Sequence, residues 1–78
     1  MDSIYLKALI ADKNGNWDQA HDLIQDSDTI HAAWIHAYLH RKEGDLWNAQ
    51  YWYKKANKPL FHGSLDEEWE ALYYEFSK

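Results

Sequence analysis

Two histidines in the middle of the chain have the spacing that a metal site requires. His36 and His40 lie four positions apart in a segment with a helical pattern, so both imidazoles would project from one helix face. Such a pair can ligate a metal ion, but a site needs at least one further ligand. The sequence offers three candidates for it, namely His21, His62 and Glu43. The alternative, which we favour, is a semi-buried pair hydrogen-bonded to Tyr53 or a backbone carbonyl, with no metal and no other cofactor.

Residues suited to nucleophilic or phosphate chemistry are sparse. The chain has no cysteine, and its four serines lie at chain ends or expected helix caps, where capping accounts for them: Ser3, Ser27, Ser64 and Ser77. The three glycines are isolated and build no phosphate-binding loop, and no His-Glu-x-x-His element is present. We therefore predict that the protein is not an enzyme.

Charge and aromatic content narrow the choice of partner. Thirteen acidic residues against eight Lys and Arg give a net charge of −5, which argues against nucleic acid or an anionic membrane as the main ligand. The run Tyr51-Trp52-Tyr53 has the rings for base stacking, but the nearby basic residues are too few to follow a phosphate backbone: Lys54, Lys55 and Lys58. We expect Trp52 and Tyr53 to pack inward, and Trp47 and Tyr51 to point outward.

Length and apolar patterning indicate a single small domain spanning residues 1–78. The longest fully apolar runs, residues 8–11 and 32–35, cover only four positions, so neither a membrane span nor a signal peptide is expected. We accordingly expect a cytoplasmic protein.

Turn-forming residues divide the chain into five segments of helical length. These turn segments are Asn14-Gly15-Asn16, Asp26-Ser27-Asp28, Glu43-Gly44-Asp45 and Pro59 to Ser64. These breaks predict helices over about residues 3–13, 17–25, 29–42, 46–57 and 64–77.

The last of these helices carries the clearest start signal. Ser64 followed by Glu67 fits a capping box, in which the two side chains satisfy each other's exposed backbone amides. The apolar residues that follow fall on one helical stripe: Leu65, Trp69, Leu72 and Phe76.

An internal repeat relates the first two helices to the next two. Placing Gly15 over Gly44 aligns the two halves at a separation of 29 residues. The aligned pairs are alike in size or polarity: Tyr5 with Trp34, Ala8 with Ala37, Ile10 with Leu39, Asn16 with Asp45, Ala20 with Ala49 and Ile24 with Tyr53. Each unit is therefore predicted to be a helix, a glycine turn and a second helix.

These repeated residues resemble the tetratricopeptide repeat. The matching positions lie in the turn and in both helices: Gly15, Ala20 and Ile24 in the first unit, Gly44, Asp45, Ala49, Tyr53 and Ala56 in the second, and Ala8 and Ala37 in the first helices. The period of 29 is shorter than the 34 residues of that family. The stretch from His36 to Tyr53 also resembles small bacterial repeat proteins of unassigned function.

The resemblance implies an all-α fold of the right-handed α-α superhelix type. Two antiparallel hairpins, over about residues 2–27 and 29–58, would be followed by a capping helix over about residues 64–77.

The resemblance also implies a binding face, because the first helix of each hairpin lines a peptide-binding groove in that family. The residues carried over to this face are Tyr5, Leu9, Asp12 and Lys13, followed by His31, Trp34, Tyr38, Arg41 and Lys42. Tyr, Trp and Arg dominate interface energetics, which suits such a face. The alternative is that the last helix folds back and buries Tyr5, Trp34 and Tyr38 as core.

We therefore expect a non-catalytic protein–protein interaction module that binds an unidentified peptide or protein through this face. A second hypothesis is a self-associating structural homodimer, because two hairpins fall short of the three repeats usually needed for a stable stack. A helical metal-binding protein built on His36 and His40 is the third hypothesis.

Overall fold

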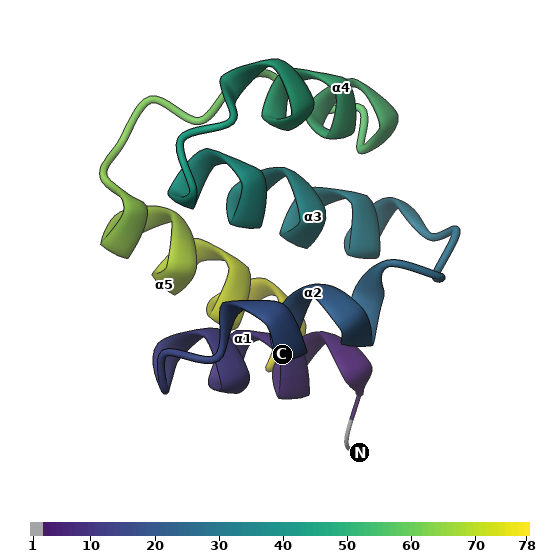
Figure 1. The fold of residues 1–78 in the computed structure, drawn as a ribbon, viewed down its shortest axis with the longest axis vertical. Coiled ribbons are helices and arrows are strands. Elements are labelled where there is room, and N and C mark those ends of the chain that lie inside the picture. Colours follow the sequence, from purple (N-terminus) through teal and green to yellow (C-terminus); the bar gives the residue numbers. More distant parts are fainter. Residues whose placement is uncertain (1–2) are drawn as a thin grey trace.

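The computed structural model describes residues 3–78, which form five α-helices and, over that range, no β-strand (Figure 1). The helices are α1 (Ile4–Lys13), α2 (Trp17–Ile24), α3 (Ile30–Lys42), α4 (Leu46–Lys55) and α5 (Leu65–Phe76). The all-α class and the five predicted helices are thus confirmed, with ends shifted by one or two residues. None of these helices is long and apolar enough to cross a membrane.

Side-chain caps set most of the helix starts. The side chains of Ser3, Thr29 and Asp45 each accept a hydrogen bond from a backbone amide in the first turn of the following helix. Ser64 and Glu67 form the predicted capping box at the start of α5. Asn16 precedes α2 as expected, but its side chain makes no capping bond.

The two glycine turns have the same backbone structure. Gly15 has a φ of +85° and Gly44 a φ of +87°, a conformation that glycine adopts without steric cost. The Gly15 amide donates to the Asp12 carbonyl and the Gly44 amide to the Arg41 carbonyl, at the same spacing. The turns therefore repeat at the separation of 29 residues seen in the sequence.

Each turn connects two helices that pack against each other, α1 with α2 and α3 with α4. Small residues lie at both helix–helix contacts, and all four are fully buried: Ala8, Ala20, Ala37 and Ala49. The two hairpins meet where α2 packs against α3.

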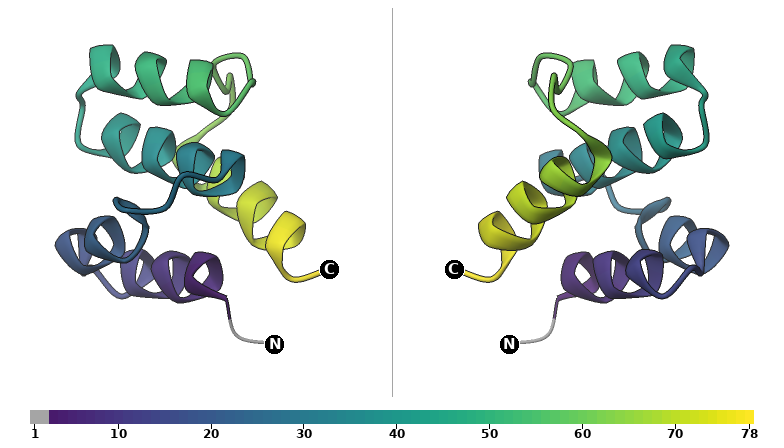
Figure 2. Two further views of the ribbon diagram at one scale, coloured as in Figure 1. Left: turned by 90° about the vertical axis from the view of Figure 1, so that its right-hand side faces the viewer. Right: turned by 90° about the vertical axis from the view of Figure 1, so that its left-hand side faces the viewer.

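Helix α5 does not extend this series but crosses it. It packs against α1 and α3, and Figure 2 shows it running from the second hairpin towards the first. Trp69 and Leu72 are buried in this contact, and the Trp69 indole donates to the Leu9 carbonyl at 2.9 Å. The last helix therefore connects both hairpins and completes the core.

Candidate functional site

The predicted binding face is divided between the core and the surface. Leu9, Trp34 and Tyr38 are buried, with exposed fractions of 0%, 8% and 2%. Tyr5 and Arg41 are partly buried, whereas His31 and Lys42 are exposed. The last helix packs over Trp34 and Tyr38, which is the alternative that the sequence leaves open for these two residues.

A buried carboxylate on α5 binds three side chains from the second hairpin. Glu68 is fully buried and accepts hydrogen bonds from Trp34 Nε1 at 3.1 Å and from the Tyr53 hydroxyl at 2.5 Å. It also forms an ion pair with Arg41 at 2.9 Å, and Arg41 donates to the Gly63 carbonyl as well. Burial and the Glu68 carboxylate raise the pKa of Tyr53, which keeps this phenol protonated.

A second buried carboxylate joins the hairpins. Asp12 on α1 accepts a hydrogen bond from the Tyr38 hydroxyl and pairs with Lys42, both at 2.8 Å. Burial and the Asp12 carboxylate raise the pKa of Tyr38. The basic residues of the predicted face, Arg41 and Lys42, thus bind carboxylates of this chain.

A different apolar surface lies on the outer side of α4. Trp47 is 75% exposed, Leu46 58% and Tyr51 46%. With Gln50 and Lys54 these residues follow the helical spacing along one exposed stripe, which we call the α4 surface. The opposite side of α4 presents Ala49 and Tyr53 to the core.

Basic side chains border the α4 surface. Lys54, within the α4 surface, and Lys55 beside it are exposed, and neither pairs with a carboxylate within residues 3–78. Lys58 is also exposed, but its ammonium lies over the Trp34 ring, 4.1 Å from the centroid. The Lys55 ammonium lies 5.4 Å from the centroids of the Tyr51 and Trp52 rings. Apolar rings and unpaired positive charges are therefore adjacent on this side of the molecule.

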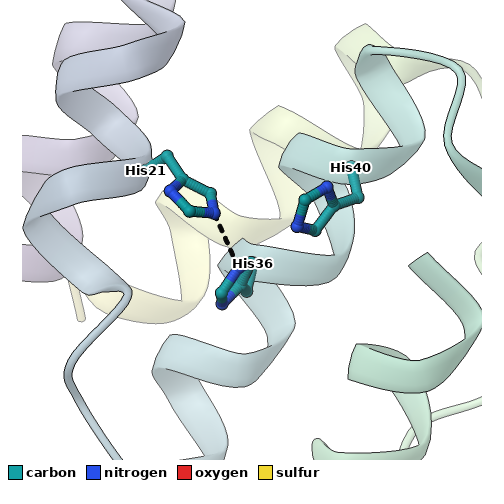
Figure 3. Close-up of side chains that lie close together, drawn as sticks. All are labelled: His21, His36 and His40. Atoms are coloured by element: carbon teal, nitrogen blue, oxygen red, sulfur yellow. Dashed lines mark hydrogen bonds between the residues drawn. The ribbon is translucent and has the colours of Figure 1, made fainter. Parts of the chain in front are cut away.

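The histidine pair identified in the sequence meets a third histidine. His36 and His40 on α3 face His21 on α2, and the ligand-capable nitrogens of all three lie within 4.8 Å of one another (Figure 3). His36 Nε2 and His21 Nε2 are 2.8 Å apart and share a hydrogen bond. His40 Nδ1 bonds to Glu43 at 2.6 Å, and Nε2 of that ring makes no hydrogen bond within residues 3–78. We call these three residues the histidine cluster.

Aromatic rings enclose the histidine cluster. Trp52 stacks on His36 with ring centroids 3.8 Å apart, and Trp17 stacks on His21 at 5.0 Å. The Trp17 indole donates to the Leu39 carbonyl at 2.8 Å, which ties α2 to α3 beside the cluster. Burial, reinforced by the two neighbouring histidines, lowers the pKa of His36 to about 3, and burial lowers that of His21.

The predicted hydrogen bonds from His36 and His40 to Tyr53 or to a backbone carbonyl do not form within residues 3–78, because His36 bonds to His21 and His40 to Glu43. The sequence named His21 only as one of three possible third ligands, and no spacing rule selects it. Of the other two, Glu43 contacts His40 and His62 lies exposed in the segment before α5. The packing of α2 on α3 brings His21 next to His36.

No family model, no curated protein and no solved structure matches this chain.

Proposed function

We propose that the protein is a non-catalytic interaction module that binds an acidic segment of a partner protein on the α4 surface. Two tetratricopeptide-like hairpins would be the scaffold, with α5 as its capping helix. The single observation that carries the proposal is the 75% exposure of Trp47 beside the exposed Leu46 and Tyr51. Large exposed apolar groups that cluster on a small protein mark interaction sites.

The repeat assignment is supported by the matched turns. Gly15 and Gly44 share the positive φ and the turn hydrogen bonds, and the aligned alanines are all fully buried. A hairpin of this kind requires a small residue where its two helices approach. In a repeat, this requirement for a small residue recurs at a fixed separation along the chain.

Burial of the rings on the α4 surface would provide the affinity. A large aromatic side chain offers roughly 150–250 Å² of surface, and Trp and Tyr are enriched among residues that cost at least about 2 kcal/mol when truncated. Trp47 and Tyr51 lie one helical turn apart, so one extended or helical segment can cover both.

The charge around the α4 surface specifies the partner. Lys55 lies over the Tyr51 ring, and neither it nor Lys54 pairs with a carboxylate within residues 3–78, so Asp and Glu of a partner would neutralise them. The face formed by α1 and α3 is a poorer candidate, because α5 already covers Trp34 and Tyr38 there.

The proposal is tested by selecting peptides from a random displayed library on the immobilised protein. We expect the selected peptides to be acidic and to contain at least one large apolar residue. Binding to the Trp47→Ala plus Tyr51→Ala variant should be at least about 30-fold weaker, which corresponds to one interface hot spot. The matched control is Tyr74→Ala on α5, where an exposed ring is removed from another surface.

Three outcomes would contradict the proposal. They are no selected peptide, selected peptides without acidic character, and binding that is unchanged by the double substitution on α4. Light scattering over a concentration series distinguishes the proposal from the homodimer hypothesis. If the wild type is a dimer and the double variant is a monomer, the α4 surface is used for self-association instead. A monomer at micromolar concentration agrees with the proposal.

A further inference from the structure

We propose that His21, His36 and His40 form a binding site for a divalent transition-metal ion of the zinc class, located between α2 and α3. The site is independent of the α4 surface and of the partner proposed for it. It rests on the convergence of three imidazoles that the fold brings together from two hairpins.

The spacing of the ligand atoms fits a small metal ion. Zinc–nitrogen bonds of about 2.0–2.1 Å in tetrahedral geometry place two ligating nitrogens roughly 3.3 Å apart. In the histidine cluster the closest pair of nitrogens is 2.8 Å apart, and all three lie within 4.8 Å. Binding of one ion by all three nitrogens therefore requires rotation of the imidazoles, since the His36 and His40 rings are stacked at an interplanar angle of 20°.

The hydrogen bonds around the histidine cluster have the pattern of a metal site. A metal-ligating histidine characteristically donates its other ring N–H to a carboxylate, which fixes the tautomer and the ring orientation. His40 has this partner, since its Nδ1 bonds to Glu43 at 2.6 Å and its Nε2 remains available. For His21 and His36, the ion takes the place of the proton shared between their Nε2 atoms, and that proton moves to a ring Nδ1.

The chemistry of the ligands selects the class of ion. Three neutral imidazoles suit zinc, copper and nickel, whereas calcium and magnesium require oxygen ligands. Trp17 and Trp52 stack on His21 and His36 and cover one face of each ring. Three protein ligands leave the fourth position of a tetrahedral ion open to water or to a ligand from solution.

A second group of potential ligands shares His40. His40, Glu43 and Asp45 also bring ligand atoms within 4.8 Å of one another, but this group uses an exposed carboxylate and the residue that caps α4. We assign the ion to the histidine cluster because His36 and His21 have no other hydrogen-bonding side chain within residues 3–78.

The experiment is a calorimetric titration of tag-free, chelator-treated protein with Zn²⁺. Thermal unfolding is then measured with and without Zn²⁺. We expect one Zn²⁺ per chain, no binding of Mg²⁺, and a melting temperature raised by about 10 °C or more when free Zn²⁺ is 100 times the dissociation constant. Co²⁺ should give the visible absorption of a tetrahedral nitrogen-ligated ion.

Variants locate the site. His21→Gln and His40→Gln, whose side chains are only partly buried, should each weaken Zn²⁺ binding at least about 100-fold. Glu43→Gln should weaken it about 10- to 100-fold, as loss of an outer-shell carboxylate does. His62→Gln, at an exposed position, is the matched control and should bind as the wild type does.

Two results would overturn the proposal. One is the absence of stoichiometric binding in a folded wild-type protein, which would leave the histidine cluster as a hydrogen-bonded packing element. The other is binding that survives His21→Gln but is abolished by Glu43→Gln, which would place the ion on the His40, Glu43 and Asp45 group. Circular dichroism of each variant establishes that the helices are retained.

Discussion

At the scale of single residues, Glu68 is a buried carboxylate with three side-chain partners. It is fully buried, yet it binds an indole, a phenol and a guanidinium that come from α3 and α4. Removal of its charge leaves Arg41 without its carboxylate partner, and an uncompensated buried charge is costly. Glu68 therefore holds α5 to the second hairpin.

We predict that Glu68→Gln lowers the free energy of unfolding by about 3 kcal/mol, because one partner of a buried ion pair loses its charge. Urea denaturation followed by circular dichroism measures this change. The exposed Glu70 on the same helix is the control, and Glu70→Gln should change stability by less than about 0.5 kcal/mol. Equal effects of the two substitutions would contradict the role assigned to Glu68.

Acid should destabilise the protein through His36. The unfolded chain protonates this residue near pH 6.5, whereas the folded chain does so only near pH 3. Between these values the unfolded state binds more protons, so the free energy of unfolding falls as the pH is lowered, by up to about 1.4 kcal/mol per pH unit.

We predict that His36→Gln reduces this dependence, because glutamine does not titrate. Urea unfolding at a series of pH values from 7 to about 4 gives the slope for both proteins. His62→Gln, which removes an exposed histidine, should leave the wild-type slope in place. The same slope in His36→Gln as in the wild type would contradict the lowered pKa of His36.

At the scale of elements, the two hairpins share one turn design. Gly15 and Gly44 both have positive φ, and open space lies where a Cβ would project, so the cost of substitution is conformational. We predict that Gly15→Ala and Gly44→Ala each lower stability by about 1 kcal/mol, and by similar amounts. Thermal unfolding measures both values, with Gln50→Ala on the exposed side of α4 as the control. A negligible effect at either glycine would argue against equivalent turns.

The helices and their starts could be predicted because their signals are local. The Ser64–Glu67 capping box, the glycine turns and the repeated alanines all act within a few residues, and each is found where the sequence indicates it. Asn16 is an exception, since it occupies the predicted cap position without making the bond.

The sequence leaves two positions of α5 open, because the apolar stripe of Trp69 and Leu72 fits any apolar face of suitable width. The buried Glu68 fixes the position of α5, because its hydrogen-bond and ion-pair partners lie on α3 and α4. The sequence offers His21 only as one of three candidate third ligands for a similar reason: the contact between α2 and α3 brings His21 to His36, and no sequence spacing encodes it.

At the scale of the whole molecule, α5 covers an apolar face that the two helical hairpins leave open. Two hairpins leave one face of α1 and α3 apolar, and α5 covers it with Trp69 and Leu72. A chain of 78 residues buries a limited core, so this helix provides a large share of it.

We predict that Trp69→Ala lowers the free energy of unfolding by about 3–5 kcal/mol, the range for truncation of a buried tryptophan. Its indole also donates to the Leu9 carbonyl, which would lose this donor. Urea unfolding provides the measurement, and Tyr74→Ala, at a ring that is 69% exposed, provides the control on the same helix. A loss below about 1 kcal/mol would mean that α5 does not stabilise the hairpins as the structure indicates.

Because α5 occupies the face of α1 and α3, the α4 surface is the exposed aromatic face that remains next to unpaired lysines in the part of the chain described. The most direct test is an amide NMR spectrum of the labelled protein titrated with a selected acidic peptide. Binding on the α4 surface predicts the largest shifts within residues 46–55, around Trp47 and Tyr51. Largest shifts in α1, α3 and α5, with α4 unperturbed, would contradict it and would return the binding site to the face that α5 covers.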